Sequence, residues 1–158
     1  MSARALLARA RQCARALVRH ARARCLRHPQ LFVRVWEPDD RELGELGEEI
    51  AARRLLRAGF AVLGRRVRTP SGEVDVLARD GTEIVCVEVK TARARPLPRL
   101  RGTAPVLDTR WRPGARFTAE RLARHVRAGR VDLVEVRFEV HTRRFKVEHH
   151  RRLERPVR

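Results

Sequence analysis

The chain has 158 residues, 43% of them hydrophobic, which is enough for one domain with a core of its own and too few for two. Aromatic residues make up 4% of the chain and tyrosine is absent, so base stacking on aromatic rings is disfavoured as a way of binding nucleic acid. The net charge of +18 favours a polyanionic partner, with nucleic acid the first candidate and an anionic membrane surface the second. A compositional bias of the genome is the alternative source of the excess arginine.

Charge is distributed unevenly along the chain. Residues 1–36 carry a net charge of +9, residues 37–90 carry −3 and residues 91–158 carry +12. The acidic residues gather where the sequence reads GEVD and EVK. An acidic pocket within a basic protein is typical of a metal-dependent enzyme acting on a polyanion, because the carboxylates hold the cation while the basic surroundings hold phosphates.

Cysteine usage and hydropathy indicate where the protein works. Three cysteines without a C-x-x-C pair argue against a disulfide framework or a zinc ribbon, and neither Cys25 with His28 nor His149 with His150 completes a four-ligand zinc set. No apolar run is long enough to span a membrane, and scattered arginines interrupt the N-terminal region where a signal peptide would be apolar. We therefore expect a cytoplasmic protein without a transmembrane segment.

Residues 3–27 predict a basic amphipathic helix, because apolar side chains recur at helical spacing with arginines around the rest. Such a helix could be an arm for nucleic acid, a helix on a membrane surface, or a solvated extension without a specific role. Pro29, Pro38 and Asp39 mark the next boundary, so we assign residues 1–40 to a basic helical extension. The apolar stripe consists of Leu6, Ala10, Cys13, Leu17, Ala21 and Cys25.

The segment RELGELGEEIAARRLLRAGF predicts a second helix that Gly59 caps at its C-terminus. Its packing side includes one carboxylate, Glu48. An ordinary explanation is that Glu48 sits at the edge of that side and reaches solvent or an arginine. Ala51, Ala52, Leu55 and Leu56 share the packing side, and Arg53, Arg54 and Arg57 are expected to face water.

Three strands are predicted in FAVLGRRVR, GEVDVLA and TEIVCVEVK, with TPSG and RDGT as turns. If Asp80 and Gly81 form a two-residue hairpin loop, Asp75 lies opposite Cys86. A register error of one residue would break the resulting arrangement, whereas an error of two would keep it. Alternation gives an apolar face of Val74, Val76, Ala78, Val85, Val87 and Val89, and it brings Glu73, Asp75, Glu88 and Lys90 together at one end of the other face.

The remaining elements complete an α/β pattern. Residues 91–114 are rich in Pro, Gly and Arg and predict a mobile loop, and residues 115–128 predict a further helix. VDLVEVRFEV and RFKVEH predict two paired strands. The order indicates a mixed β-sheet flanked by helices over residues 41–150, followed by a basic tail at 151–158.

Lys90 is one of only two lysines in a chain whose other 35 basic residues are arginines. A lysine ammonium is a compact charge that fits beside two carboxylates and a water, which a planar guanidinium does not. Two carboxylates from adjacent strands, this lysine and a glutamate from the preceding helix could hold Mg²⁺ and activate a bound water for phosphodiester hydrolysis. The alternative is an ordinary ion pair of Lys90 with Glu88, or a charged sheet edge that keeps the protein soluble.

The stretch from GELGEEIAARRLL to EVKTAR, residues 44–93, resembles the core of the YraN-type uncharacterised bacterial family. That family's pattern runs G-x-x-G-E-x-x-A, then G-E-[IV]-D, then E-V-K. VEVRFEV at residues 134–140 resembles the family's later R-F-D-V strand, with Glu139 in the aspartate position. The resemblance implies a restriction-endonuclease-like PD-(D/E)XK core, similar to that of archaeal Holliday-junction resolvases.

The resemblance also implies roles for residues. Asp75 and Glu88 would be metal ligands for Mg²⁺, with Mn²⁺ as an alternative ion, and Lys90 and Glu48 would be catalytic. We therefore expect a metal-dependent endonuclease acting on DNA, in branched or single-stranded forms, or alternatively a non-catalytic nucleic-acid-binding protein that retains the nuclease fold. Cleavage of two strands makes a homodimer attractive on symmetry grounds. Arginines of the following loop would bind backbone phosphates: Arg93, Arg95, Arg99, Arg101, Arg110 and Arg112.

Overall fold

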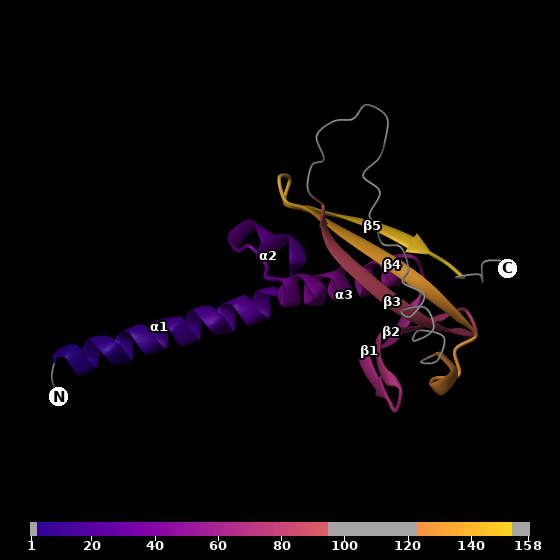
Figure 1. Ribbon diagram of the computed structural model, residues 1–158, viewed down its shortest axis with the longest axis horizontal. Coiled ribbons are helices and arrows are strands. Elements are labelled where there is room, and N and C mark those ends of the chain that lie inside the picture. Colours follow the sequence, from indigo (N-terminus) through magenta and orange to yellow (C-terminus); the bar gives the residue numbers. More distant parts are fainter. Residues whose placement is uncertain (1–2, 95–122, 153–158) are drawn as a thin grey trace.

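The computed structural model describes residues 3–94 and 123–152, and in this part of the chain three helices accompany a five-stranded sheet (Figure 1). The strand order is β1-β2-β3-β4-β5, and β3 and β4 are parallel while the other neighbours are antiparallel. The predicted mixed sheet flanked by helices is thus confirmed. The elements are α1 (Ala3–Cys25), α2 (Pro29–Val35), α3 (Asp40–Arg57), β1 (Ala61–Thr69), β2 (Gly72–Asp80), β3 (Glu83–Ala94), β4 (Arg130–Glu139) and β5 (Arg144–His150).

Helix α1 is the predicted basic helix and is continuous over 23 residues. It projects away from the sheet, and its C-terminal end meets the region of α2 and α3 (Figure 1). Within the described part of the chain, no helix is both long enough and apolar enough to cross a membrane.

Helix α2 begins at Pro29, which suits the first turn of a helix because the missing N–H has no partner there. Its side chains Phe32 and Val33 are fully buried and pack in one cluster with Leu46 of α3 and Phe138 of β4. The sequence groups this segment with the N-terminal extension, yet Phe32 and Val33 pack against the sheet domain, while Leu31 is exposed.

Helix α3 begins and ends where the sequence predicts. The Asp39 carboxylate accepts a hydrogen bond from the Glu42 backbone N–H at 2.8 Å, and the Glu42 carboxylate accepts one from the Asp39 N–H at 2.9 Å, forming a capping box. Gly59 has a φ of +88°, the left-handed conformation that ends many helices. The placement of Leu56 on the packing side was wrong: it is 55% exposed, because the neighbouring Leu55 faces the sheet and successive side chains are turned by about 100°.

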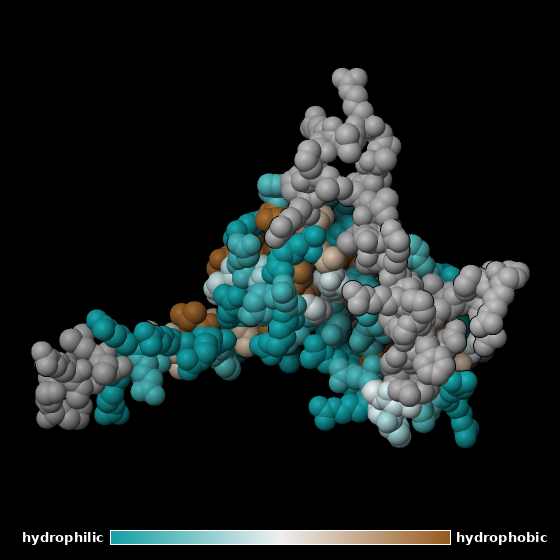
Figure 2. Space-filling model, viewed as in Figure 1, coloured by the Kyte–Doolittle hydropathy of each residue, from teal (hydrophilic) through white to brown (hydrophobic). Residues whose placement is uncertain are grey.

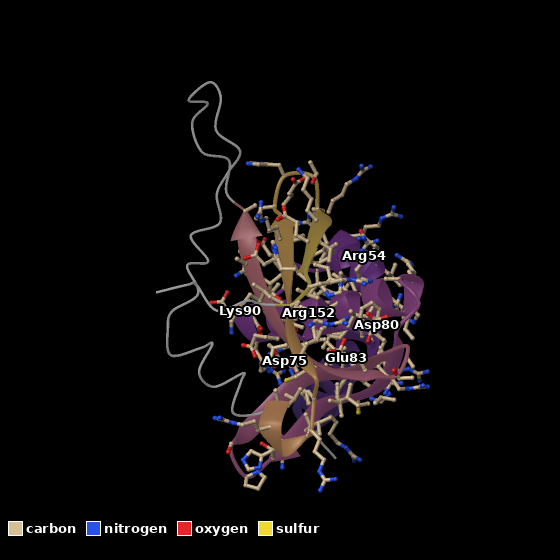
Figure 3. All side chains as sticks on the ribbon, turned by 90° about the vertical axis from the view of Figure 1, so that its right-hand side faces the viewer. Arg54, Asp75, Asp80, Glu83, Lys90 and Arg152 are labelled. Atoms are coloured by element: carbon tan, nitrogen blue, oxygen red, sulfur yellow. The ribbon has the colours of Figure 1, made fainter. Side chains whose placement is uncertain are left out.

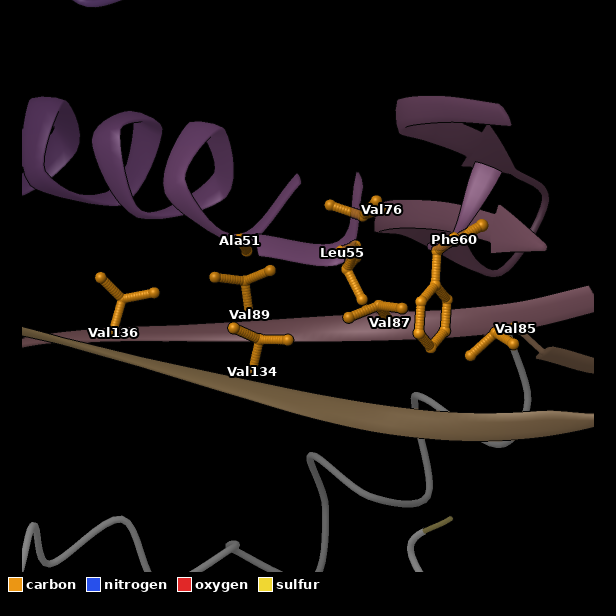
Figure 4. Packing of buried hydrophobic residues seen from close by; sticks show 10 residues of the cluster. Ala51, Leu55, Phe60, Val76, Val85, Val87, Val89, Val134 and Val136 are labelled. Atoms are coloured by element: carbon orange, nitrogen blue, oxygen red, sulfur yellow. The ribbon is translucent and has the colours of Figure 1, made fainter. Parts of the chain in front are cut away.

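The main core lies between α3 and one face of the sheet (Figure 4). Helix and strand approach closely at Gly47, where an added Cβ would lie 1.8 Å from Thr91 Oγ1. Only glycine fits at that position without a shift of β3. The cluster contains Ala51, Leu55, Phe60, Val76, Ala78, Val85, Val87, Val89, Val134 and Val136.

The hairpin between β2 and β3 has a register that differs from the predicted one by two residues. Asp80 pairs with Glu83 and Leu77 pairs with Cys86, so the loop is Gly81-Thr82 rather than Asp80-Gly81. Gly81 has a φ of +58°, which suits the first central position of a tight hairpin turn. The predicted pairing of Asp75 with Cys86 was therefore wrong, but a shift of two preserves the alternation. Five residues of the predicted apolar face, Val76, Ala78, Val85, Val87 and Val89, lie in the core with α3, whereas Val74 is buried in a separate cluster with Cys86 and Ala123.

The segment after Lys90 differs from the expected loop. Strand β3 continues to Ala94, since Thr91–Ala94 pair with β4 from Val136 to Glu139. The predicted loop beyond residue 94 lies outside the described residues, as does the predicted helix up to residue 122. Residues 123–125 are helical, and Ala123 is buried against Val74 and Cys86.

Candidate functional site

Three of the residues predicted as a site, Asp75, Glu88 and Lys90, lie on the face of the sheet turned away from α3, whereas Glu48 lies on α3 itself. Alternation along β3 directs Val87 and Val89 toward α3 and directs Glu88 and Lys90 to the opposite face. The register brings Lys90 beside Glu135 of β4, so the polar face continues across the sheet. It includes Glu73 and Asp75 of β2, Glu88 and Lys90 of β3, Glu135 and Arg137 of β4, and Glu148 and His150 of β5.

Asp75 lies where the backbone pairing of β2 with β3 stops. The paired residues end at Val76 and Val87. Beyond that point the side chain of Asp75, rather than the backbone of β2, pairs with β3. Its Oδ2 accepts a hydrogen bond from the Val89 backbone N–H at 2.7 Å. The carboxylate is thereby fixed against β3 between the backbone positions of Glu88 and Lys90.

The environment of Asp75 favours its protonated form. Burial of the carboxyl raises its pKa to about 6, and the negative charge of Glu88 adds to the effect. The hydrogen bond from Val89 and the charge of Lys90 oppose the rise, while Glu48 contributes to it. Four of the residues that the sequence singled out therefore interact electrostatically: Glu48, Asp75, Glu88 and Lys90.

Lys90 forms a close ion pair with Glu88 on the same strand, with 2.5 Å between Nζ and Oε1. The Glu88 side chain is 16% exposed and that of Lys90 is 44% exposed, so the ammonium reaches the surface of the sheet while the carboxylate is sheltered. Figure 3 shows Lys90 and Asp75 near each other on neighbouring strands, and Asp80 and Glu83 farther along the same strands.

Glu48 reaches an arginine, as the ordinary explanation for its position expected. Its two carboxylate oxygens accept hydrogen bonds from Arg66 of β1 at 2.7 and 3.0 Å, and Arg65 lies 4.0 Å away. These hydrogen bonds raise the pKa of the Arg66 guanidinium above its usual value. Glu48 is thus joined to β1 in this structure, although its negative charge still helps to raise the pKa of Asp75.

The donor set fits a magnesium ion held by two carboxylates. Mg²⁺ is commonly bound through one or two carboxylates, with waters and substrate phosphates completing its octahedron, and Asp75 and Glu88 supply such oxygens from adjacent strands. Glu48 does not complete a three-ligand cluster with them. Among the described residues, the ligand atoms of one trio lie within 4.8 Å of one another, and that trio is Glu135, Glu148 and His150.

The trio on β4 and β5 was missed by sequence reasoning, which considered His150 only for zinc. His150 Nε2 lies 3.5 Å from Glu135 Oε2. Arg137 lies 3.5 Å from Glu135 and 3.4 Å from Glu148, so an arginine already offsets part of the negative charge of this group. The alternation in VEVRFEV and KVEHH was the available signal, but it needed the register of β3 on β4 to place Glu135 beside Lys90.

A second ionic network lies at the hairpin end of the sheet, on the α3 side. The fully buried Asp132 accepts hydrogen bonds from His149 at 2.9 Å, from the Arg152 backbone N–H at 2.9 Å and from Arg130 at 3.0 Å. Burial alone would raise the pKa of Asp132, but these bonds hold it below its usual value. Arg130 also contacts Asp80 and Glu83, each at 2.6 Å, so these acids fasten the hairpin to β4 and belong to no predicted site.

Of the arginines predicted to bind phosphates, the structure describes Arg93. Its guanidinium donates hydrogen bonds to the Asp40 carboxylate and to the Pro38 carbonyl, at the start of α3. Arg93 thus links β3 to α3, and its phosphate role stays a prediction. Arg95, Arg99, Arg101, Arg110 and Arg112 lie outside the described residues.

Comparisons with known proteins match part of the chain to one protein family. Residues 47–136 match the uncharacterised protein family UPF0102. The UPF0102 protein STH1475 of Symbiobacterium thermophilum is 49% identical over 55 residues, 35% of this chain and 47% of the relative. UPF0102 proteins of Kineococcus radiotolerans and Streptomyces griseus are 54% and 52% identical over 52 residues, 33% of this chain and 43% and 44% of those relatives. The alignments span less than half the length of these curated relatives.

One solved structure is similar in outline. It is titled "The structure of Pyrococcus Furiosus SfsA in complex with Ca2+", and it is 18% identical with a TM-score of 0.37, covering 73% of this chain and 65% of that chain.

Proposed function

The chain belongs to the uncharacterised protein family UPF0102, the YraN-type family, and we propose that it is a metal-dependent endonuclease with a PD-(D/E)XK core that hydrolyses phosphodiesters in DNA. One observation carries the proposal. Asp75 is held against β3 by its bond to Val89, beside Glu88 and Lys90, at the point where the two strands stop pairing. Two carboxylates and an ammonium on adjacent strands are the groups that phosphodiester hydrolysis with a divalent cation requires.

Each residue has a distinct task in this proposal. Asp75 and Glu88 hold the cation, which when bound would polarise the phosphodiester and lower the pKa of a water. Lys90 is 2.5 Å from Glu88, so its ammonium is positioned to orient the attacking water or to balance the charge that develops on the phosphate. Glu48 would act through Asp75, because its negative charge helps to keep that site receptive to a cation.

The DNA would be held by its backbone. The net charge of +18 supplies the attraction, and the arginines from Arg93 to Arg112 are proposed to contact phosphates without reading bases. Branched or single-stranded DNA is the proposed substrate form. A homodimer would place two sites on two strands.

A non-catalytic nucleic-acid-binding protein is the second candidate, and one observation favours it. Both oxygens of Glu48 are bonded to Arg66, and Glu88 is paired with Lys90, so chain cations already neutralise two of the three carboxylates. A protein that only binds nucleic acid would not need Asp75 or Glu88 to bind a metal ion.

Calorimetric titration with Mn²⁺ or Mg²⁺ separates the two candidates. The endonuclease predicts binding of a divalent cation that is lost in Asp75→Asn and Glu88→Gln and kept in Glu73→Gln, which removes an exposed charge from the same strand. Cleavage of duplex, single-stranded and four-way-junction DNA with either ion then identifies the substrate form. Equal cation binding by all variants, or none by the wild type, would support the non-catalytic candidate.

A further inference from the structure

The exposed part of α1 presents a row of arginines that the proposed site does not use. Arg11, Arg15 and Arg19 are spaced four residues apart, so they lie on one face of the helix, about 6 Å apart along its axis. All three are exposed, and no carboxylate among the described residues pairs with them. Residues 1–36 contain no acidic residue at all, so nothing in the segment offsets this charge.

Helix α1 is fastened to the domain at its C-terminal end. The Arg22 guanidinium donates two hydrogen bonds to the buried Glu42 carboxylate at 2.5 and 2.6 Å and one to the Glu37 carbonyl at 3.0 Å. It also lies over the ring of Phe32, 5.3 Å from the centroid, and Cys25 packs against the same cluster. Because Glu42 is part of the α3 capping box, α1 leaves the domain from a defined point, as Figure 1 shows.

The apolar side of α1 is poorly suited to a lipid surface. Helices that lie in a membrane interface bury large side chains such as Trp, Phe and Leu. Residues 1–27 contain no aromatic residue, and Leu17 and Val18 are the large hydrophobic side chains that the described residues of α1 expose. Figure 2 accordingly shows the projecting helix as mainly hydrophilic with a small hydrophobic patch.

We infer that the Arg11–Arg15–Arg19 face of α1 is an arm that binds the phosphate backbone of nucleic acid outside the proposed catalytic site. The inference rests on the nucleic-acid part of the proposed function, and it needs no catalysis. The charge is complementary to a polyanion, and the spacing of about 6 Å is close to that of successive phosphates in an extended strand. The arm lies before residues 47–136, so it is a feature of this chain beyond the matched family region.

Binding of a labelled 20-base-pair DNA by the full chain, measured by fluorescence anisotropy in EDTA at several salt concentrations, tests the arm. The triple variant R11Q/R15Q/R19Q should weaken binding on the order of tenfold or more at 0.1 M salt, and lower the slope of log K against log salt by about 2.7 if each arginine neutralises one phosphate. R11K/R15K/R19K should bind within about threefold of wild type, because lysine keeps the charge. The matched control R54Q/R57Q/R144Q removes three exposed arginines elsewhere and should cost much less.

The outcomes distinguish the arm from the proposed catalysis. Equal losses in the glutamine triple and its control, or no loss in either, would overturn the arm whether or not the wild type cleaves DNA. A selective loss in the α1 triple supports the arm even if cleavage is absent, because EDTA keeps the metal site out of the measurement. Flotation with vesicles of phosphatidylcholine and phosphatidylglycerol at 7:3 completes the test: vesicle binding that needs the three arginines, with DNA binding unchanged by their loss, would replace nucleic acid by a membrane as the partner.

Discussion

At the scale of single residues, Asp75 has two roles: it accepts a hydrogen bond from the sheet backbone, and it is a proposed metal ligand. Its carboxylate takes the Val89 N–H and at the same time lies near Glu88, Glu48 and Lys90. The buried negative charge is unfavourable to folding, and a bound cation would offset it. In the proposed endonuclease, this loss of stability accompanies the ability to bind a metal ion.

The raised pKa of Asp75 makes a prediction about stability and pH. In the folded chain this pKa is about 6, above the ordinary value of 3.8, so the folded state binds the proton more tightly than the unfolded state does. The free energy of unfolding therefore falls as pH rises from about 4 to 6 and is lowest, from this residue, above that range. Asp75→Asn keeps an acceptor for Val89 without the charge, and it should stabilise the metal-free protein at pH 8 by about 1–3 kcal/mol.

Urea unfolding in EDTA at pH 4.5 and pH 8 measures this difference. The gain from Asp75→Asn should be clearly smaller at the lower pH, where the wild-type carboxyl of the folded chain is already protonated. Glu73→Gln, which removes an exposed charge from the same strand, is the matched control. A gain of the same size at both values would contradict the assignment of a buried, charge-coupled carboxylate.

At the scale of elements, Gly47 lets α3 pack closely on β3, and the ion pair of Arg22 with Glu42 joins α3 to α1. Gly47 and Gly44 lie on the same helix, but only Gly47 lies against a neighbouring strand, where Thr91 occupies the space of a Cβ. This difference makes a matched pair of substitutions.

Gly47→Ala should destabilise the fold by about 1–3 kcal/mol, because the added methyl must displace Thr91 from its position on β3. Gly44→Ala, with open space around it, should stabilise the fold by about 0.5–1 kcal/mol, since alanine is the better helix former. Thermal and urea unfolding of both variants measure the two effects. Stabilisation by both substitutions would mean that α3 lies farther from the sheet than described.

Arg22→Gln should lower the free energy of unfolding by about 1–3 kcal/mol, because it removes two charge-assisted hydrogen bonds from a carboxylate that is only 6% exposed. Arg24→Gln makes the same change in charge at an exposed position two residues away and should cost under about 0.5 kcal/mol. Urea unfolding of the two variants compares these costs. Equal effects would show that α1 is not fastened through Glu42.

Sequence periodicity was sufficient to predict which side chains share a face of the sheet, but not which residues pair across neighbouring strands. Asp75, Glu88 and Lys90 share a face because alternation is insensitive to a register error of two, and this error arose because Gly81 takes the first position of the turn. The binding of Glu48 to Arg66 depends on β1, which has a register shift between Val62 and Gly64 and a positive φ at Arg66.

The pairing of β3 with β4 marks a second limit of sequence reasoning. No local pattern fixes how a strand returns after a long connection, so the position of Glu135 beside Lys90 could not be predicted. The same holds for the Arg130 network, whose partners come from β2, β3 and β4. In both cases the missing information is the long-range register, which only the packed sheet specifies.

At the scale of the whole molecule, the two faces of the sheet have different roles. One face packs on α3 and forms the core, while the other carries a polar row from β2 to β5 with Asp75, Glu88 and Lys90 where β2 and β3 part. The basic helix α1 extends the molecule away from that sheet (Figure 1). The proposed endonuclease thus combines a small acidic site with a strongly basic remainder.

The most direct test of the proposed endonuclease is cleavage of DNA in Mg²⁺ or Mn²⁺ by wild type, Asp75→Asn, Lys90→Ala and the control Glu73→Gln, with binding measured on the same samples. Asp75→Asn and Lys90→Ala should lose at least about 100-fold in cleavage rate while still binding DNA, and the control should stay near wild type. Absence of cleavage by the wild type, or equal cleavage by all four proteins, would contradict a catalytic site at Asp75, Glu88 and Lys90.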